Sequence, residues 1–387
     1  MTPALTVFID SLKPESVECM DFLSSFENKA RVKTELPSYS NTCHASMYTG
    51  VYPNKHLHEF IWYYSPETSC FNPLKKLGLH WAFKDKYTKF ICFEALSMLN
   101  FKTSPYGYFF FQRYPLDYWT NFNFAAVKFW GKPDSFVGGY PTVFEILRRN
   151  KIRYDVYWST KGPLKKINNR SYLNPWTYYF IGHMDTYSHF YGQESPKARE
   201  FLAIVDKRLE NLYSAYKKLY GEDFTFFAFS DHGQTKIEER VDLHVFFASK
   251  GGNLNDYLHI IDSCYARFWF RNDKEREEVG RILQKMNDKG FILTEEIMKK
   301  YHAEIPDNRY GDLIFYLDKP CIFDVVNPNA ISMHGYLPDH SDSDGIFISN
   351  KKIVNLPYIK LEDIAPSLLS IFGIERPKNM DGNVIWK

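Results

Sequence analysis

Apolar runs of strand length recur along the chain, and each one stops at polar residues. Three such runs cover residues 5–9, 178–181 and 224–229. Each run is followed closely by an aspartate, namely Asp10, Asp185 and Asp231. Continuous apolar runs are typical of buried strands in a parallel sheet. Because ligands of open α/β sheets bind outside the carboxyl ends of the strands, we expect the three aspartates to share one sheet edge.

Segments with a helical pattern separate the apolar runs. Residues 140–149 have a proline near the start of an apolar-faced helix, and residues 152–158 then alternate as a strand does. Residues 196–219 form a long amphipathic pattern that leads into the run at 224–229. This rhythm predicts an α/β fold with a doubly wound, mostly parallel central sheet flanked by helices.

The pattern also predicts how the chain is divided. We expect an α/β core built from residues 1–61, 140–245 and 331–387. Residues 62–139 are rich in aromatics and lack periodicity, but they are too many for a structureless loop. They are interpreted either as an inserted lid or cap, or as additional packing. Residues 246–330 have a strand–helix–strand pattern and are predicted to form a small inserted α/β lobe.

Composition narrows the class of protein. The chain has 387 residues, of which 44% are hydrophobic, so it can bury one large core with an insertion, or two cores. With 48 Lys+Arg against 46 Asp+Glu, no basic field favours a nucleic-acid polymer. No apolar run is long enough to span a membrane. The start lacks the features of a signal peptide, which favours a cytoplasmic enzyme, and the six cysteines are then expected to be free thiols. The oligomeric state stays open.

Histidines accompany the strand-end aspartates. His189 follows Asp185 by four residues and would share its helix face, His232 directly follows Asp231, and His334 precedes a glycine. Each residue alone is also explained as a turn, cap or loop residue. Together, three carboxylates and three imidazoles are a donor set that suits zinc. A pair of such ions suits phosphoryl chemistry.

Two further positions have open interpretations. Residues 45–48 are predicted to form a short helix that Gly50 ends, and Ser40 or Thr42 would lie near its start. A hydroxyl there is either a nucleophile beside an anion site or a helix cap. Arg267, which lies among aromatic residues, is either a contact for a substrate anion or a core or solvated arginine.

These motifs resemble, in order, those of the alkaline phosphatase superfamily, specifically its type I phosphodiesterase/nucleotide pyrophosphatase branch. The matching segments span nearly the whole chain, and they are residues 8–10, 37–56, 185–192, 230–233, 334–336 and 362–382. The resemblance implies an alkaline-phosphatase-like fold and two divalent metal ions, Zn²⁺ foremost and Mn²⁺ as the alternative. One ion would be held by Asp10, Ser40, Asp231 and His232. The other would be held by Asp185, His189 and His334.

The resemblance also implies a mechanism. Ser40 would be the nucleophile, would form a phosphoserine intermediate, and water would then hydrolyse it. The implied activity is hydrolysis of a small-molecule phosphodiester or pyrophosphate. A phosphomonoesterase, a phosphonate hydrolase and a phosphotransferase use the same metal core and remain alternatives, as does a binding protein with a degenerate site.

The sequence departs from the family pattern at two points. The usual nucleophile is threonine rather than serine. The family also has an asparagine soon after a His-Gly pair that holds a phosphate oxygen, whereas His56 is followed here by Leu57 without that asparagine. We hypothesise that Asn41, next to Ser40, takes that role. The sulfatase signature Cys-x-Pro-x-Arg is absent, which argues against a sulfatase.

Overall fold

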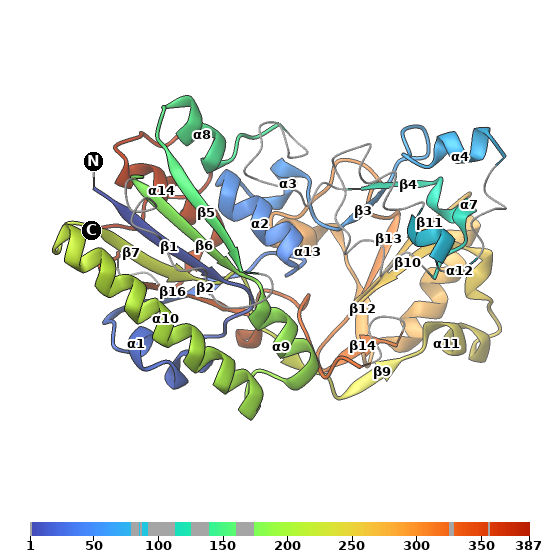
Figure 1. Cartoon of the computed structure of the whole chain (residues 1–387). Coiled ribbons are helices and arrows are strands. Elements are labelled where there is room, and N and C mark those ends of the chain that lie inside the picture. Colours follow the sequence, from blue (N-terminus) through green and yellow to red (C-terminus); the bar gives the residue numbers. More distant parts are fainter. Residues whose placement is uncertain are drawn as a thin grey trace. The chain divides into compact units, whose positions relative to one another are not determined.

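The structure is a computed structural model of the whole chain (Figure 1). It describes residues 2–78, 85, 87–91, 113–124, 139–159, 174–324, 329–354 and 357–387. The chain divides into two compact units. Unit 1 contains residues 1–52, 141–237 and 329–387, and unit 2 contains residues 53–140 and 238–328. The predicted insertion and the predicted lobe therefore both belong to unit 2, and much of the insertion lies outside the described residues.

A seven-stranded sheet in the order β17-β2-β16-β7-β1-β6-β5 is the centre of unit 1. Its strands are β1 (Ala4–Ile9), β2 (Asn28–Lys33), β5 (Tyr154–Ser159), β6 (Trp176–Ile181), β7 (Thr225–Phe229), β16 (Gly345–Ser349) and β17 (Ile359–Lys360). Neighbouring strands pair in parallel except at β16, which is antiparallel to both β7 and β2. The predicted mostly parallel α/β sheet is confirmed.

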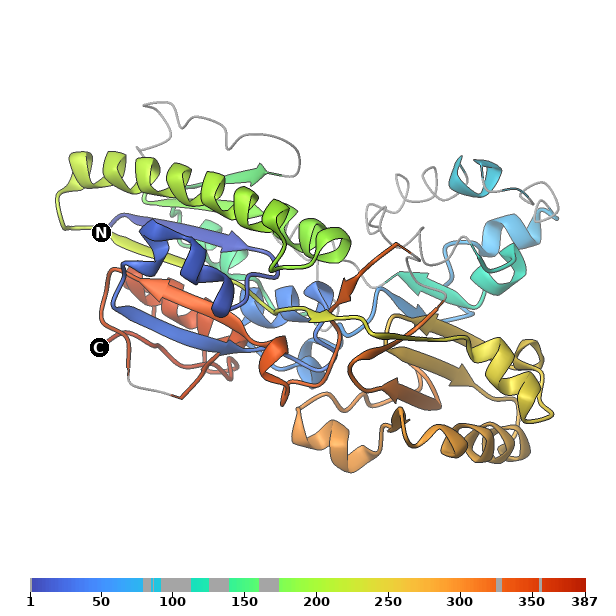
Figure 2. The same cartoon turned by 90° about the horizontal axis from the view of Figure 1, so that it is seen from below.

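Helices cover both faces of this sheet, because alternate side chains of a strand point to opposite faces. Leu5, Val7 and Ile9 of β1 pack in one core with the helix α10 (Pro196–Tyr220). The helix α1 (Asp21–Ser24) packs against α10 on the same side (Figures 1 and 2). The helices α2 (Ser40–Thr49), α8 (Val143–Arg149) and α14 (Ile364–Ile371) pack together, and Thr6 faces that side.

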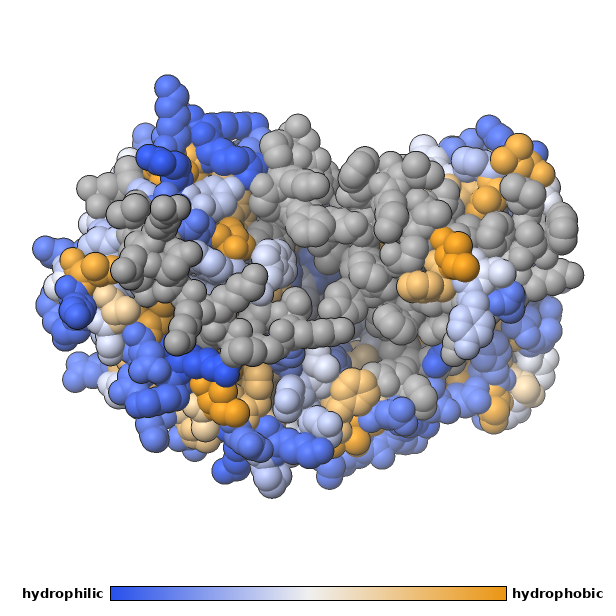
Figure 3. Space-filling view, viewed as in Figure 1, coloured by the Kyte–Doolittle hydropathy of each residue, from blue (hydrophilic) through white to orange (hydrophobic). Residues whose placement is uncertain are grey.

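The helix α10 shows why its sequence is amphipathic. Its buried positions include Leu202, Val205 and Leu209, which recur at the three- or four-residue spacing of one helix face. The opposite face is mainly hydrophilic, although Ile204 and Leu219 are exposed (Figure 3). Ser195 begins the helix by accepting a hydrogen bond from the Ala198 N–H at 3.1 Å.

The strand register brings distant polar residues to one edge of the sheet. Ile9 of β1 lies opposite Ile181 of β6, and Phe8 lies opposite Phe229 of β7. The residues that follow these strands therefore meet at the carboxyl edge, as the sequence predicts. Gly233 is required there because a Cβ atom would lie 2.2 Å from the carbonyl oxygen of Asp342.

Unit 2 has a four-stranded antiparallel sheet in the order β10-β11-β13-β12. The strands of this sheet are β10 (Leu258–Asp262), β11 (Tyr265–Trp269), β12 (Gly290–Ile292) and β13 (Leu313–Leu317). Two smaller sheets of unit 2 pair β3 (Trp62–Tyr64) with β4 (Phe122–Phe124), and β9 (Glu239–Val241) with β14 (Cys321–Phe323). The helices of unit 2 are α3 (Pro53–His56), α4 (Asn72–Lys76), α7 (Leu116–Trp119), α11 (Leu243–Ser249), α12 (Asp273–Leu283) and α13 (Glu295–Lys300). An aromatic cluster around Trp62, Trp119 and Trp269 joins the 62–139 segment to the 246–330 segment.

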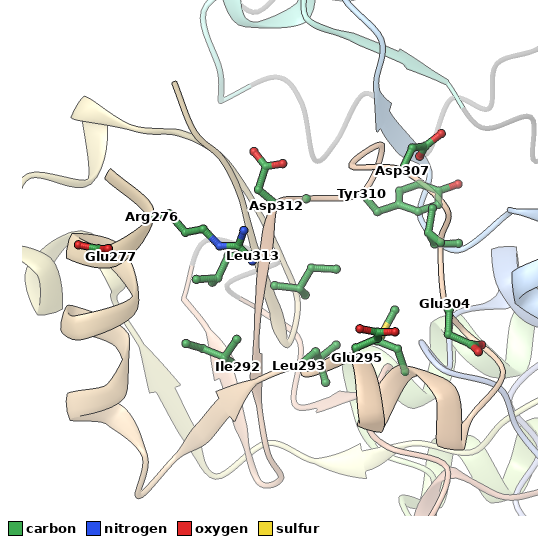
Figure 4. A pocket seen from close by; sticks show the side chains of 14 residues that line it. Arg276, Glu277, Ile292, Leu293, Glu295, Glu304, Asp307, Tyr310, Asp312 and Leu313 are labelled. Atoms are coloured by element: carbon green, nitrogen blue, oxygen red, sulfur yellow. The ribbon is translucent and has the colours of Figure 1, made fainter. Parts of the chain in front are cut away.

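A cavity of about 510 Å³ lies within unit 2 (Figure 4). Two of the carboxylates that line it are already engaged by protein groups. Asp307 pairs with Arg309 at 2.8 Å, and Glu304 accepts a hydrogen bond from the Asn54 side chain at 3.1 Å. None of the predicted site residues lines this cavity.

Two other sequence predictions concern the whole chain. Among the described residues, no helix is both long and apolar enough to cross a membrane. The five described cysteines are free thiols, and Cys92 lies outside the described residues.

Candidate active site

Asp10, Asp231 and His232 meet at the carboxyl edge of the unit 1 sheet. Each offers a ligand atom, and these atoms lie within 4.8 Å of one another. His232 Nε2 is 3.4 Å from Asp231 Oδ2 and 3.8 Å from Asp10 Oδ1. The three side chains are buried, so the two carboxylates have little water to solvate their charge. A divalent cation would supply the missing positive charge.

Asp185 and His334 form a second group together with the same His232, again within 4.8 Å. Both Asp185 and His189 lie on the helix α9 (His183–Tyr191), and His189 Nε2 is 3.3 Å from Asp185 Oδ1. His334 Nε2 is 3.6 Å from the same oxygen. The rings of His232 and His334 stack with their centroids 4.1 Å apart, so the two groups adjoin.

The three histidines have the same orientation. The Nδ1 of each lies at hydrogen-bond distance from a backbone carbonyl oxygen: 3.1 Å for His232 to Gly233, 2.9 Å for His189 to Ser332, and 2.9 Å for His334 to Ser38. A carbonyl can only accept, so Nδ1 carries the proton and Nε2 keeps its lone pair. Each Nε2 is turned toward a carboxylate. Backbone-anchored imidazoles of this kind are typical of metal ligands.

The pKa values of the clustered carboxyls and of His232 are also those expected around a cation. Burial raises the pKa of Asp231 to about 8, and burial with the negative charge of Asp231 raises the pKa of Asp10 well above its usual range. Burial is the largest single influence on Asp185, but His189, His334 and His232 together outweigh it and hold the pKa of this carboxyl below its usual value. Burial lowers the pKa of His232 to about 4. Crowded carboxylates beside a neutral imidazole fit a cation.

Ser40 lies beside the first group. Helix α2 begins at Ser40, earlier than the predicted helix at residues 45–48, and ends at Gly50 as expected, with φ +72° there. The Ser40 hydroxyl is 3.0 Å from His232 Nε2 and 3.5 Å from Asp10 Oδ1. It therefore points to the candidate metal ligands, whereas Tyr39 occupies the cap position and its side chain does not cap the helix. Thr42, the other candidate, is fully buried.

Asn41 and Arg267, the two predicted substrate contacts, have different surroundings. Asn41 follows Ser40 on α2, and neither atom of its buried amide makes a hydrogen bond within the described residues. Arg267 belongs to unit 2 and is fully buried. Its guanidinium donates to the Trp62 carbonyl at 3.0 Å and lies 4.1 Å from the centroid of the Phe60 ring. These are the surroundings of a core arginine.

Sequence reasoning missed the residues that hold the ligands in place. Gln234 donates to Asp185 Oδ1 at 2.7 Å, and Ser332 in turn donates to Gln234 Oε1 at 2.6 Å. His44 lies on α2 with Nε2 3.6 Å from Asp231 Oδ2. The available signal was proximity in sequence, since Gln234 follows His232 by two residues and His44 follows Ser40 by one helical turn.

Comparison with known protein families assigns the chain to one of them. A sequence model of the type I phosphodiesterase/nucleotide pyrophosphatase family matches residues 101–336, more than half of the chain. The chain belongs to this family. It is thus a hydrolase that acts on phosphoester bonds, in this branch of the alkaline phosphatase superfamily. The matched segment contains Asp185, Asp231 and His334, whereas Asp10 and Ser40 precede it and join them through the fold.

Structural comparison agrees on the fold of this phosphodiesterase family member. Human ectonucleotide pyrophosphatase/phosphodiesterase 5 is similar with a TM-score of 0.67 at 13% sequence identity. The similarity covers 97% of this chain and 96% of that chain. At such low identity it shows the alkaline-phosphatase-like fold alone. No curated protein matches the sequence at a significant level.

Proposed function

We propose that the protein hydrolyses a small-molecule phosphodiester or pyrophosphate with two divalent cations and Ser40 as nucleophile. The observation that carries the proposal is the shared orientation of His189, His232 and His334, each with Nε2 turned toward a buried carboxylate. Zn²⁺ best matches this mixture of imidazoles and carboxylates, and Mn²⁺ is the alternative. When bound, such cations lower the pKa of a hydroxyl and balance the charge of phosphate oxygens.

The ligands fall into two sets in this proposal. Asp10, Ser40, Asp231 and His232 would hold one cation, and Asp185, His189 and His334 the other. Asp185 is the residue most directly engaged by imidazoles, with both His189 and His334 within 3.6 Å of its Oδ1. The hydrogen bond from Gln234 fixes the orientation of that carboxylate.

Ser40 Oγ would then attack phosphorus. The new Oγ–P bond forms as the bond from phosphorus to the leaving oxygen breaks, and the hydroxyl proton passes to solvent. The leaving oxygen takes up a proton from solvent. Water later cleaves the Oγ–P bond, which returns the serine and releases the phosphate monoester that keeps the other arm of the substrate. The first backbone N–H groups of α2 lie next to Ser40 and favour the negative phosphate.

Asn41 is proposed to hold a phosphate oxygen in place of the asparagine that the family has after His-Gly. Its amide lacks hydrogen bonds within the described residues, which supports a role as a hydrogen-bond donor to the substrate. Both amide atoms are covered by protein, so this contact requires rotation of the side chain. Loss of activity in Ser40→Ala with full activity in Asn41→Ala would remove this role.

The test combines metal analysis with a substrate panel. Zinc stoichiometry is measured first, and about two ions per chain are expected. Turnover of bis-p-nitrophenyl phosphate, a nucleotide diester and p-nitrophenyl phosphate is then compared. Much faster turnover of the monoester than of either diester would instead indicate a phosphomonoesterase.

Matched variants identify the nucleophile. Ser40→Ala should abolish turnover. Thr42→Val also removes a hydroxyl group from α2, two residues further along, and should retain turnover in folded protein. Acid quenching during turnover should trap the phosphoryl group, with one arm of the substrate still attached, on the peptide that contains Ser40. Trapping on Thr42, or turnover by Ser40→Ala, would contradict the mechanism.

A further inference from the structure

His44 is a buried histidine beside the candidate site that none of the proposed roles uses. It lies on α2, and its ring is surrounded by the rings of Phe8, Phe180 and Tyr48, with centroid distances of 5.1, 5.6 and 5.9 Å. The side chain is 9% exposed. Its Nε2 makes no hydrogen bond within the described residues. Surroundings of aromatic rings favour an apolar side chain, so packing alone does not explain a polar imidazole at this position.

Within the described residues, this nitrogen faces Asp231 Oδ2 at 3.6 Å. That oxygen also makes no hydrogen bond within the described residues. The other oxygen, Oδ1, accepts from the backbone N–H groups of His232 at 3.0 Å and Ser11 at 3.4 Å. One half of the carboxylate is therefore anchored to the backbone, and the other half faces His44 and His232.

His232 is unsuited to donate to this oxygen. Its Nδ1 carries the proton that Gly233 accepts, so its Nε2 has a lone pair and repels a carboxylate oxygen unless a cation lies between them. His44 has no such constraint at Nε2. Two buried polar atoms that face each other without partners are unfavourable, and an Nε2–H donor on His44 satisfies both. The separation of 3.6 Å needs to shorten to about 3 Å for this hydrogen bond.

We propose that His44 is a positioning residue that donates its Nε2–H to Asp231 Oδ2 and so orients that carboxylate toward the first cation; this rests on the proposed function. His44 belongs to neither group of candidate ligands in the described structure. It would act through Asp231. A side chain that orients a ligating carboxylate typically changes metal affinity by about 10- to 100-fold when it is lost.

The experiment measures the affinity of both zinc sites in the full chain by competition with a chelator. His189→Ala serves as the reference that identifies the binding event of the second site. His44→Leu removes the donor but keeps an apolar side chain in the aromatic cage. His44→Gln restores an N–H donor near the position of Nε2.

The expected result is a loss of about 10- to 100-fold in affinity at the first site only for His44→Leu, with the second site unchanged and affinity largely restored in His44→Gln. The zinc concentration that gives half-maximal turnover should rise by the same factor. Unchanged affinity in His44→Leu would overturn the proposal. Equal losses in the Leu and Gln variants, with equal falls in melting temperature, would assign His44 to packing alone. Wild-type protein that binds no zinc would instead refute the proposed function, and this inference with it.

Discussion

A buried pair of glutamates should make the stability of unit 1 depend on pH. Glu35 precedes α2 and Glu362 lies in the short helix Leu361–Asp363, which packs against α2. Both carboxyls are buried. Burial raises the pKa of Glu362 from 4.5 to about 7, and burial with the charge of Glu362 raises the pKa of Glu35 well above its usual value. We predict that Glu362→Gln will flatten the stability profile between pH 5 and pH 8.

The sign and the size of this pH dependence of stability follow from the shift in the pKa of Glu362. Because the folded pKa is raised, the folded chain binds more protons than the unfolded chain between pH 4.5 and 7, so stability present at low pH is lost as pH rises through about 7. A shift of that size corresponds to about 3 kcal/mol for Glu362. Lys360, with Nζ 3.8 Å from Glu362 Oε1, favours the charged form, and the raised pKa is what remains after this attraction has opposed burial.

For a unit of this size, 3 kcal/mol corresponds to a melting temperature change of roughly 10 °C. The assay is thermal and urea unfolding of wild-type and Glu362→Gln protein from pH 5 to pH 8, with saturating zinc so that the site carboxylates keep their state. Glu375→Gln, which changes an exposed glutamate, is the matched control. A wild-type slope retained in Glu362→Gln, or an equal flattening in Glu375→Gln, would refute the reasoning.

Three other predictions concern the candidate metal site and two buried side chains. Chelation should lower the melting temperature of the wild type and have a smaller effect on Asp231→Ala; equal effects would count against a cation at Asp231. Asp206 accepts hydrogen bonds from the N–H groups of Phe22 and Leu23 at 2.7 and 3.0 Å. Asp206→Ala should therefore cost about 2 kcal/mol in urea unfolding with unchanged turnover per folded chain, and an unshifted urea midpoint would contradict this. Arg267→Met should lower the melting temperature and leave KM unchanged, whereas a raised KM in a protein of normal stability would favour the substrate contact that the sequence suggested.

The sequence specified the strand-end aspartates well because their signal is local. A buried parallel strand needs an unbroken apolar run, and the polar residues that follow it must lie at the carboxyl edge. Asp10 and Asp231 meet there because Phe8 lies opposite Phe229 in the sheet. The α9 spacing of Asp185 and His189 was equally readable, since four residues make about one helical turn.

The start of α2 and the surroundings of Arg267 were harder to predict from the sequence. The polar residues before Ala45 suggest a loop, yet the helix begins at Ser40, because tertiary packing outweighs weak helix propensity. Arg267 lies among aromatic residues in the sequence, a pattern shared by exposed binding sites and by cores. Its burial is decided by the β11 strand and by Phe60 and Trp62, about two hundred residues earlier.

The sequence by itself thus determined the α/β class, the strand-end carboxylates and the histidines that accompany them. The tertiary structure alone decided that Gln234 supports Asp185, that His44 faces Asp231, and that Glu35 meets Glu362. The physical reason is the range of the interactions. Periodicity and turn chemistry act over a few residues and leave a pattern in the sequence, whereas a pairing across hundreds of residues depends on how the whole sheet and its helices pack.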